Sequence, residues 1–198
     1  MSVPPAPPLL LASRSPQRRA ILEQLGVPFE VVLPQFDEAG ADAGSDPKST
    51  VRENARGKAR SVASVAAGRP VLGVDTEVVV EGRVLGTPGN ASEAEAMLEA
   101  LAGRTHEVVS GLCLLTPGWE EVEHEVTRVS FRELDARDLA RYIGTGEWEG
   151  RAGAYAVQGR GAALVERIEG DYLNVVGLPA ALLVLLLAAR FPGVYGFG

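Results

Sequence analysis

The most informative residue in this sequence is Asp75, a carboxylate inside an apolar run. Residues 71–80 read Val-Leu-Gly-Val-Asp-Thr-Glu-Val-Val-Val. Burying a carboxylate is costly unless the group is paired, hydrogen-bonded or bound to a cation. Two interpretations stay open. Either Asp75 takes part in chemistry, as an oxygen ligand of Mg²⁺ or Mn²⁺ or as the group that orients a water, or Asp75 and Glu77 simply face solvent on an alternating strand.

Two further polar stretches follow apolar runs. Residues 13–19, Ser-Arg-Ser-Pro-Gln-Arg-Arg, come directly after the run at 9–12. A strand that enters a helix N-terminus presents free N–H groups and a positive dipole end, which suits a phosphate. Ser13, Ser15 and Arg18 would add side-chain donors; alternatively, Ser15 only caps the helix and the arginines are solvated. Asp37 and Glu38 form the other stretch. One of these carboxylates and Asp75 could converge on one cation.

Composition and motif searches exclude several classes. The net charge is −7 and the basic residues are scattered, which argues against nucleic acid polymers but not against a small phosphorylated ligand. The sequence contains no P-loop and no dinucleotide fingerprint. One cysteine, Cys113, and two histidines make a disulfide, a zinc site or a histidine-centred triad improbable. Residues 1–8 lack a signal-peptide pattern, and 179–191 is too short to span a bilayer, so we expect a soluble cytoplasmic protein without membrane contact.

The elements that would position these residues follow from hydrophobic periodicity and capping signals. Helices are expected from Ser15-Pro16 to before Gly26, over 49–67, from a Ser92/Glu95 capping box to Leu101, from Asp135 to Ile143, and over 179–191. Strands are expected at 9–12, 29–32, 71–80, 83–85, 106–115, 123–131 and 163–168, followed by a turn at Gly170-Asp171 and the segment 172–176. Hairpins mixed with helices predict an α/β fold with a mixed sheet. Residues 1–8 form a proline-rich tail, and 9–198 form one domain.

Seven short motifs then follow one another along residues 9–190. They are Leu-Ala-Ser-Arg-Ser-Pro-Gln-Arg-Arg at 11–19, Asp-Glu at 37–38, Asn-Ala-Arg-Gly-Lys-Ala at 54–59, Gly-Val-Asp-Thr at 73–76, Leu-Ala-Gly-Arg-Thr-His at 101–106, Ala-Gly-Ala-Tyr-Ala-Val-Gln-Gly at 152–159 and Val-Gly-Leu-Pro at 176–179. Each motif alone is weak, but the ordered set resembles the Maf family of nucleoside triphosphate pyrophosphatases.

The resemblance implies a single elongated α/β domain, with two lobes around a nucleotide cleft, related to inosine triphosphatases. Members are often dimeric, so a homodimer is one expected assembly. The implied reaction is attack of water at the α-phosphorus, with pyrophosphate leaving. Asp75, Lys58 and Glu38 are then catalytic, and Glu38 and Asp75 hold Mg²⁺ or Mn²⁺. The implied substrate-binding residues are Ser13, Ser15, Gln17, Arg18, Thr76 and Gln158.

Two of these residues point to a substrate type. Thr76 and Gln158 resemble the dTTP/UTP type, modified nucleotides included, and the Gln158 amide offers both a donor and an acceptor to a pyrimidine edge. A 7-methyl-GTP-type pyrophosphatase and a non-catalytic nucleotide-binding regulator of cell division are the alternatives. The sequence departs from the family at Gln17 and Arg151, and at Thr87, where a lysine is usual. Arg83 is a candidate to replace that missing ammonium.

Overall fold

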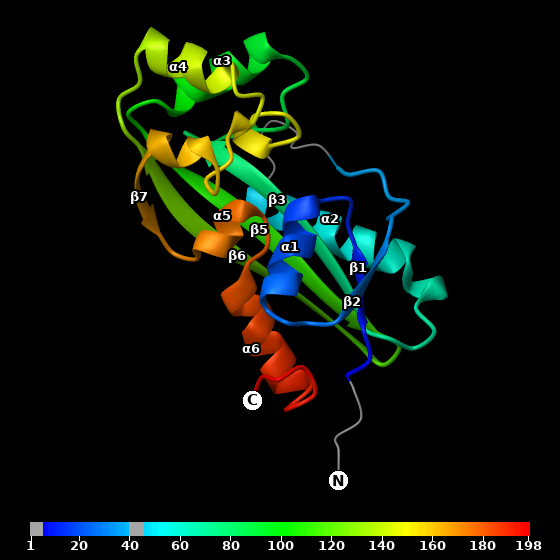
Figure 1. Ribbon diagram of the computed structural model, residues 1–198. Helices are drawn as coiled ribbons and strands as arrows, with labels where there is room; N and C mark the ends of the chain where they lie inside the picture. Colours follow the sequence, from blue (N-terminus) through cyan, green and yellow to red (C-terminus); the bar gives the residue numbers. More distant parts are fainter. Residues whose placement is uncertain (1–5, 40–45) are drawn as a thin grey trace.

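A computed structural model describes residues 6–39 and 46–198 as an α/β fold built on one seven-stranded mixed sheet (Figure 1). The strand order is β2-β1-β3-β5-β6-β7, and β4 pairs with β3. This confirms the predicted fold class. The first five residues of the predicted tail lie outside the described residues. The strands are β1 (Leu9–Ala12), β2 (Phe29–Val32), β3 (Val71–Val80), β4 (Arg83–Leu85), β5 (Thr105–Thr116), β6 (Trp119–Phe131) and β7 (Val165–Glu169).

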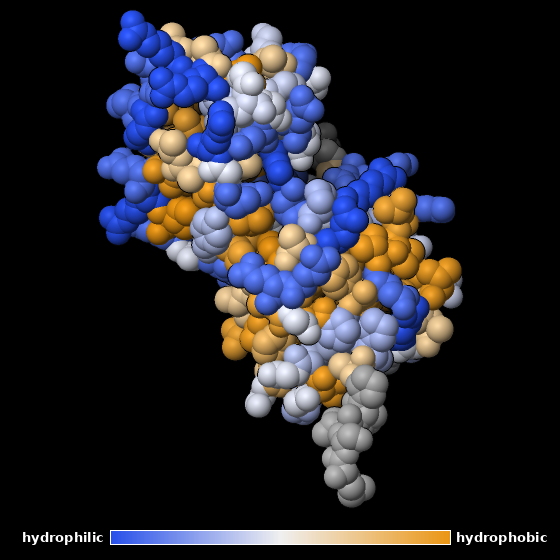
Figure 2. Space-filling view, viewed as in Figure 1, coloured by the Kyte–Doolittle hydropathy of each residue, from blue (hydrophilic) through white to orange (hydrophobic). Residues whose placement is uncertain are grey.

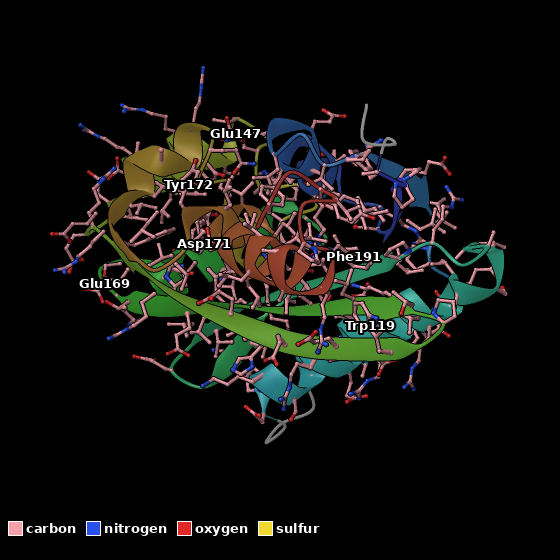
Figure 3. All side chains as sticks on the ribbon, turned by 90° about the horizontal axis from the view of Figure 1, so that it is seen from below. Trp119, Glu147, Glu169, Asp171, Tyr172 and Phe191 are labelled. Carbon is pink, nitrogen blue, oxygen red and sulfur yellow. The ribbon has the colours of Figure 1, made fainter. Side chains whose placement is uncertain are left out.

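Helices cover both faces of this sheet. They are α1 (Pro16–Gln24), α2 (Pro47–Ser61), α3 (Ala91–Leu101), α4 (Ala136–Ile143), α5 (Tyr172–Val176) and α6 (Ala180–Arg190), with 3₁₀ turns at Ala63–Val65, Ala152–Ala154 and Arg160–Leu164. Helix α2 packs on one face, and α1 and α6 pack on the other (Figure 3). Helices α3 and α4 pack farther along the face that α1 and α6 cover, at the opposite end of the molecule (Figure 1).

Two apolar clusters therefore share one face of the sheet. The cluster under α1 and α6 is closed at its end by Trp119 and Phe191, whose ring centroids are 5.7 Å apart (Figure 3). Hydrophilic side chains cover much of the α3/α4 end, and hydrophobic patches lie over the rest of the face in view (Figure 2).

Cys113 is buried, as predicted for a small apolar side chain, and burial raises the pKa of its thiol to about 12. In the part of the chain that the structure describes, no helix is long and apolar enough to cross a membrane.

The sheet has an opening beside the middle of β3. On one edge of β3, β1 pairs in parallel with residues 71–73, and β4 pairs with residues 78–80. On that edge, residues 74–77 have no strand partner among the residues described, whereas β5 pairs with them on the other edge. Ligand sites in α/β proteins commonly lie where a sheet opens beyond the carboxyl end of a strand. Asp75 lies in this opening.

Two strand glycines let α2 lie directly on the sheet. A Cβ atom at Gly73 would lie 2.1 Å from the carbonyl oxygen of Ala55, and one at Gly111 would lie 2.1 Å from that of Val51. Gly111 is the cross-strand neighbour of Asp75. Polar side chains on the buried face of α2 can therefore reach Asp75 over a short distance.

The bounds of several elements differ from the prediction. Helix α2 begins at Pro47, because the Asp46 side chain caps its first N–H groups, and it ends at Ser61 rather than at 67. Strand β6 begins at Trp119 rather than at 123, since it pairs with the whole length of β5. Residues 160–164 form a 3₁₀ turn, so β7 begins at Val165 rather than at 163. The segment 172–176 is a short helix capped by Asp171.

The predicted capping box of α3 was wrong by two residues. Asn90, not Ser92, caps the helix, and its side-chain oxygen accepts the N–H of Glu93 at 2.9 Å. The Glu93 carboxylate in turn accepts the N–H of Gly89 at 2.8 Å. Asn90/Glu93 and Ser92/Glu95 have the same spacing, so the sequence pattern alone did not distinguish them.

Candidate active site

The register of the sheet brings the start of α1 beside Asp75. Ala12, the last residue of β1, pairs with Gly73 of β3, so the chain that follows β1 enters the opening in the sheet. Ser15 caps α1 there, and its hydroxyl accepts the N–H of Arg18 at 3.4 Å. The helix N-terminus and the acidic residue thus line one cavity of about 650 Å³. As predicted, the start of α1 and Asp75 lie close together.

Asp75 and Lys58 form a buried ion pair at the centre of the opening. The Lys58 ammonium lies 2.7 Å from one Asp75 carboxylate oxygen, and the two residues are 5% exposed. Glu38, which is far more exposed, contacts the same ammonium at 2.8 Å. Of the two interpretations of Asp75, the structure supports the one in which the carboxylate is buried and paired, and excludes the solvent-facing one.

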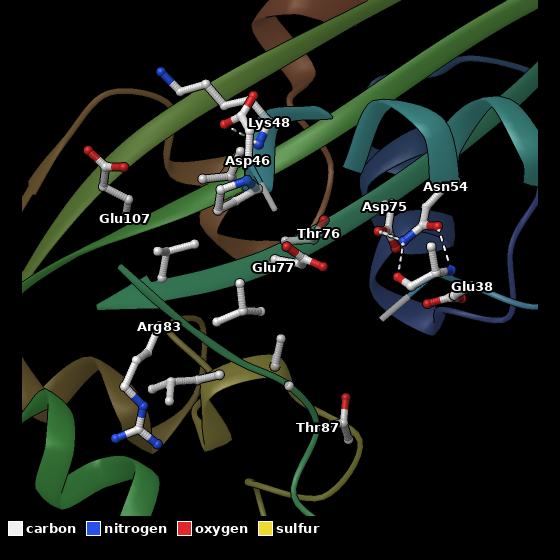
Figure 4. A pocket seen from close by; sticks show the side chains of 18 of the residues that line it. Glu38, Asp46, Lys48, Asn54, Asp75, Thr76, Glu77, Arg83, Thr87 and Glu107 are labelled. Carbon is white, nitrogen blue, oxygen red and sulfur yellow. Dashed lines mark hydrogen bonds between the residues drawn. The ribbon is translucent and has the colours of Figure 1, made fainter. Parts of the chain in front are cut away.

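Asn54 completes the surroundings of Asp75, a role that the sequence pattern did not predict. Its side-chain amide donates to Asp75 at 2.9 Å and to the carbonyl of Ala39 at 3.2 Å, and its oxygen accepts the N–H of Ala39 at 2.9 Å (Figure 4). Asn54 is 1% exposed. It therefore ties the segment that carries Glu38 to α2 and to β3. Its sequence signal was its position one helical turn before Lys58, on the face that α2 buries.

Arg18 holds three segments together from inside the cavity wall. Its Nε atom donates to the carbonyl of Gly177 at 2.9 Å, and its two terminal nitrogens donate to Ser13 at 3.1 Å and to Thr76 at 3.2 Å. Burial lowers the pKa of Arg18, although the charges of Asp75 and Glu38 oppose that shift. The alternative of a solvated guanidinium is thus wrong for Arg18, whereas Ser15 does cap the helix.

Glu77 is a second residue of the site that the sequence pattern did not predict. It shares a strand face with Asp75, two residues away, and it lines a larger cavity of about 1010 Å³ on the other side of the opening (Figure 4). Burial, and then the negative charges of Asp75 and Glu38, raise the pKa of Glu77 to about 7, while Lys58 opposes the shift. One of its carboxylate oxygens is buried and has no hydrogen-bond partner among the described residues.

The structure brings together every residue that was predicted to bind or react. The 650 Å³ cavity is lined by Ser15, Gln17, Arg18, Glu38, Lys58, Asp75, Thr76 and Gln158. Ser13 lies behind them and lines a small adjoining cavity of about 130 Å³. Thr87 lines both large cavities, whereas Arg83 lines only the larger one and not the cavity that Arg18 lines (Figure 4).

Glu38 and Asp75 are also the candidate ligands of a metal ion. Glu38 and Asp75 converge on one point, the Lys58 ammonium, and each retains lone pairs for a further cation. Within residues 6–39 and 46–198, no group of three His, Cys, Asp or Glu side chains is arranged to hold a metal. Mg²⁺ and Mn²⁺ are commonly held by one or two carboxylates together with substrate phosphates and waters. The residues present fit that kind of shared site.

The chain is similar to several known proteins. Residues 8–190 match the family described as Maf-like protein. The chain is 48% identical to a dTTP/UTP pyrophosphatase from Nitratidesulfovibrio vulgaris over 93% of this chain and 89% of the relative. It is also 48% identical to a dTTP/UTP pyrophosphatase from Symbiobacterium thermophilum, over 86% of this chain and 88% of that one. A solved nucleoside-triphosphatase (dITP/XTP pyrophosphatase) from Mycobacterium abscessus is similar at 21% identity and a TM-score of 0.42, covering 66% of this chain and 77% of that one.

Proposed function

Because this chain belongs to the Maf family, we propose that it is a nucleoside triphosphate pyrophosphatase that hydrolyses dTTP and UTP, and modified forms of them, to the monophosphate and pyrophosphate. The observation that carries the proposal is the shared cavity in which the buried Asp75–Lys58 pair lies next to the N-terminus of α1. The relatives named dTTP/UTP pyrophosphatase support the choice of nucleotide.

The chemistry needs a water placed in line with the leaving pyrophosphate, and it needs negative charge neutralised at the phosphates. Asp75 is fixed from two sides, by Lys58 at 2.7 Å and by Asn54 at 2.9 Å. A carboxylate held in this way can accept a proton from the attacking water. The N-terminus of α1 borders the same cavity, and its positive dipole end suits phosphate oxygens. Positioning and charge neutralisation of this kind supply most of the catalysis in phosphoryl transfer.

A divalent cation is part of the proposal. Glu38 and Asp75 would hold Mg²⁺ or Mn²⁺ together with oxygens of the substrate, since both carboxylates border the cavity. When bound, the cation neutralises charge that develops on the phosphates. Glu38 is the more exposed of the two carboxylates, so it can turn from Lys58 toward a cation without leaving a buried charge unpaired.

Recognition of the base is assigned to the outer part of the cavity. The exposed amide of Gln158 lines it and presents a donor and an acceptor to a pyrimidine edge. Gln17 lines it too, but its amide oxygen already accepts from the Ser15 hydroxyl at 3.0 Å, which leaves its amide donors for a base. The Thr76 hydroxyl already bonds to Arg18 and to Ser110, at 3.2 and 2.9 Å, so we assign it a role in shaping the wall. A homodimer stays a prediction from the resemblance, and a cytoplasmic location stays a prediction from the sequence pattern.

A substrate panel with identified products tests the proposal. The purified protein with Mg²⁺ or Mn²⁺ should convert dTTP and UTP to monophosphate and pyrophosphate, and chelation of the metal should stop turnover. The products orthophosphate and a nucleoside diphosphate would contradict the reaction. A higher kcat/KM for 7-methyl-GTP would reassign the base, and tight nucleotide binding without metal-stimulated turnover would indicate a regulator.

A further inference from the structure

Four cationic and two anionic side chains line the 650 Å³ cavity. The cations are Arg14, Arg18, Lys58 and Arg151, and the anions are Glu38 and Asp75. Lys58 lies between the two carboxylates, within 2.8 Å of each, so its charge is locally compensated. Arg18 is buried and donates hydrogen bonds to Ser13, Thr76 and Gly177. The charges of Arg18 and Lys58 are balanced by those of Glu38 and Asp75. These four groups together therefore have no formal net charge that would attract a polyanion.

The other two arginines are in a different situation. Arg14 is exposed, and neither Arg14 nor Arg151 makes a side-chain hydrogen bond or an ion pair with any residue that the structure describes. The Nε atom of Arg151 is buried, yet it has no hydrogen-bond partner among those residues. An arginine donor left buried without a partner is costly. Both guanidinium groups are therefore available to a ligand in the cavity.

The two arginines come from different parts of the fold. Arg14 immediately precedes Ser15, the cap of α1, toward the end of the molecule that α1 and α6 cover. Arg151 precedes the 3₁₀ turn Ala152–Ala154, and Ala152 packs in the apolar cluster of α3 and α4. A polyanion that binds both guanidinium groups would lie across the cavity, between the part of the fold that contains α1 and the part that contains α3 and α4.

We propose that Arg14 and Arg151 bind the β- and γ-phosphates of the substrate, the part that leaves as pyrophosphate. The inference rests on the proposed function. The α-phosphorus must lie near Asp75, where the water attacks, so the terminal phosphates need cations that Asp75 and Glu38 do not already neutralise. The guanidinium fork matches two phosphate oxygens at once. Arg14 and Arg151 are the cations of this cavity that meet that requirement.

The test compares a triphosphate with a monophosphate in binding experiments without turnover. The probes are α,β-imido-UTP, which resists cleavage between the α- and β-phosphates, and UMP, both titrated calorimetrically into wild type, R14A and R151A. We expect each variant to raise the Kd of the imido analogue about tenfold, equivalent to about 1.4 kcal/mol. The Kd of UMP should change less than about twofold, because UMP lacks the terminal phosphates.

R19A is the matched control, since Arg19 is also an exposed arginine of the same segment but lines none of the three cavities described above. The inference is overturned if R14A and R151A bind the imido analogue as R19A does, or if they weaken UMP as much as the triphosphate. Thermal melts identify any variant that has lost its fold, and R14K and R151K then replace it with the charge kept. A wild-type protein that binds through these arginines but releases no pyrophosphate would refute only the proposed function.

Discussion

The ammonium of Lys58 lies 2.7 Å from Asp75 and 2.8 Å from Glu38, so one buried cation holds two carboxylates that come from separate segments of the chain. Breaking a buried pair by removing one partner costs far more than a surface pair is worth. This relationship explains how an acidic residue is tolerated inside the valine-rich strand β3. It also fixes the carboxylate in the opening of the sheet, where substrate enters.

Replacing Asp75 by asparagine should remove most turnover and leave the protein folded, because Glu38 still compensates the charge of Lys58. D75N keeps the size of the side chain and an oxygen that accepts from Lys58, but it removes the proton acceptor and the anionic ligand. We expect kcat with UTP to fall at least about 100-fold, the lower end for loss of a general base. The control is D37N, because Asp37 is exposed and lines none of the cavities at this site. A D75N enzyme with near wild-type kcat would show that Asp75 is misassigned.

Asn54 should matter for both stability and activity, because it bonds to Asp75 and to both backbone polar groups of Ala39. N54A leaves these buried groups without partners, so we expect a loss of about 1–3 kcal/mol in the free energy of unfolding. The kcat should also fall, since Glu38 loses its anchored neighbour. E53A, one residue away on the exposed face of α2, removes only a surface ion pair with Arg56 and should change little. Equal effects of the two variants on kcat would contradict the role of Asn54.

The local elements of the fold could be predicted from the sequence because their signals are local. The apolar runs predicted β1, β2 and β3, and the capping residue Asp135 predicted the start of α4. The cap of α3 was misplaced because two residues satisfy the same spacing to a glutamate, and the local pattern does not distinguish them.

The site shows the same division between local and long-range information. Asp75 stood out because its neighbours in the strand are apolar, and the ordered motifs then indicated Lys58 and Glu38. The opening in the sheet could not be predicted, since it depends on where β1 stops along β3 and where β4 begins. The bond between Asn54 and Ala39 joins two residues 15 positions apart in the sequence, so only the structure revealed it.

The stability of the fold should depend on pH through His106, which bonds to Tyr155 in the wall of the 650 Å³ cavity. Its ring bonds to the Tyr155 hydroxyl at 2.9 Å, and burial lowers the pKa of His106 to about 4. An unfolded histidine has a pKa near 6.5. Because the folded pKa is the lower one, the unfolded chain binds more protons below pH 6.5. This contribution to stability is therefore complete above that pH and is lost as the pH falls toward 4.

Urea unfolding of wild type and H106Q between pH 7 and pH 4 measures the contribution. The wild type should lose about 3 kcal/mol more than H106Q over that range, since each pKa unit corresponds to about 1.4 kcal/mol. H124Q, a variant of the other histidine in the sequence, controls for the loss of a histidine as such. Parallel pH profiles for the wild type and H106Q would show that His106 does not cause the dependence.

The close approach of α2 to β3 leads to the last prediction, which connects the packing of the fold with the site. A Cβ atom at Gly73 would lie 2.1 Å from the carbonyl oxygen of Ala55, so G73A must lift the helix that carries Asn54 and Lys58. We expect a loss of about 1–3 kcal/mol in the free energy of unfolding, as for an overpacked core. Turnover should fall as well, because both side chains would move away from Asp75.

G118A is the matched control for this prediction, because a Cβ atom at Gly118 would have no heavy atom within 4 Å. Its stability should stay within about 0.5 kcal/mol of wild type, as for most surface substitutions. If G73A kept full stability but lost turnover, the glycine would be needed for activity but not for the packing of α2 on β3. If it lost stability but kept kcat, the position of α2 would not control Asp75. Loss of both quantities, against an unchanged G118A, is the result that a helix packed directly on the catalytic strand requires.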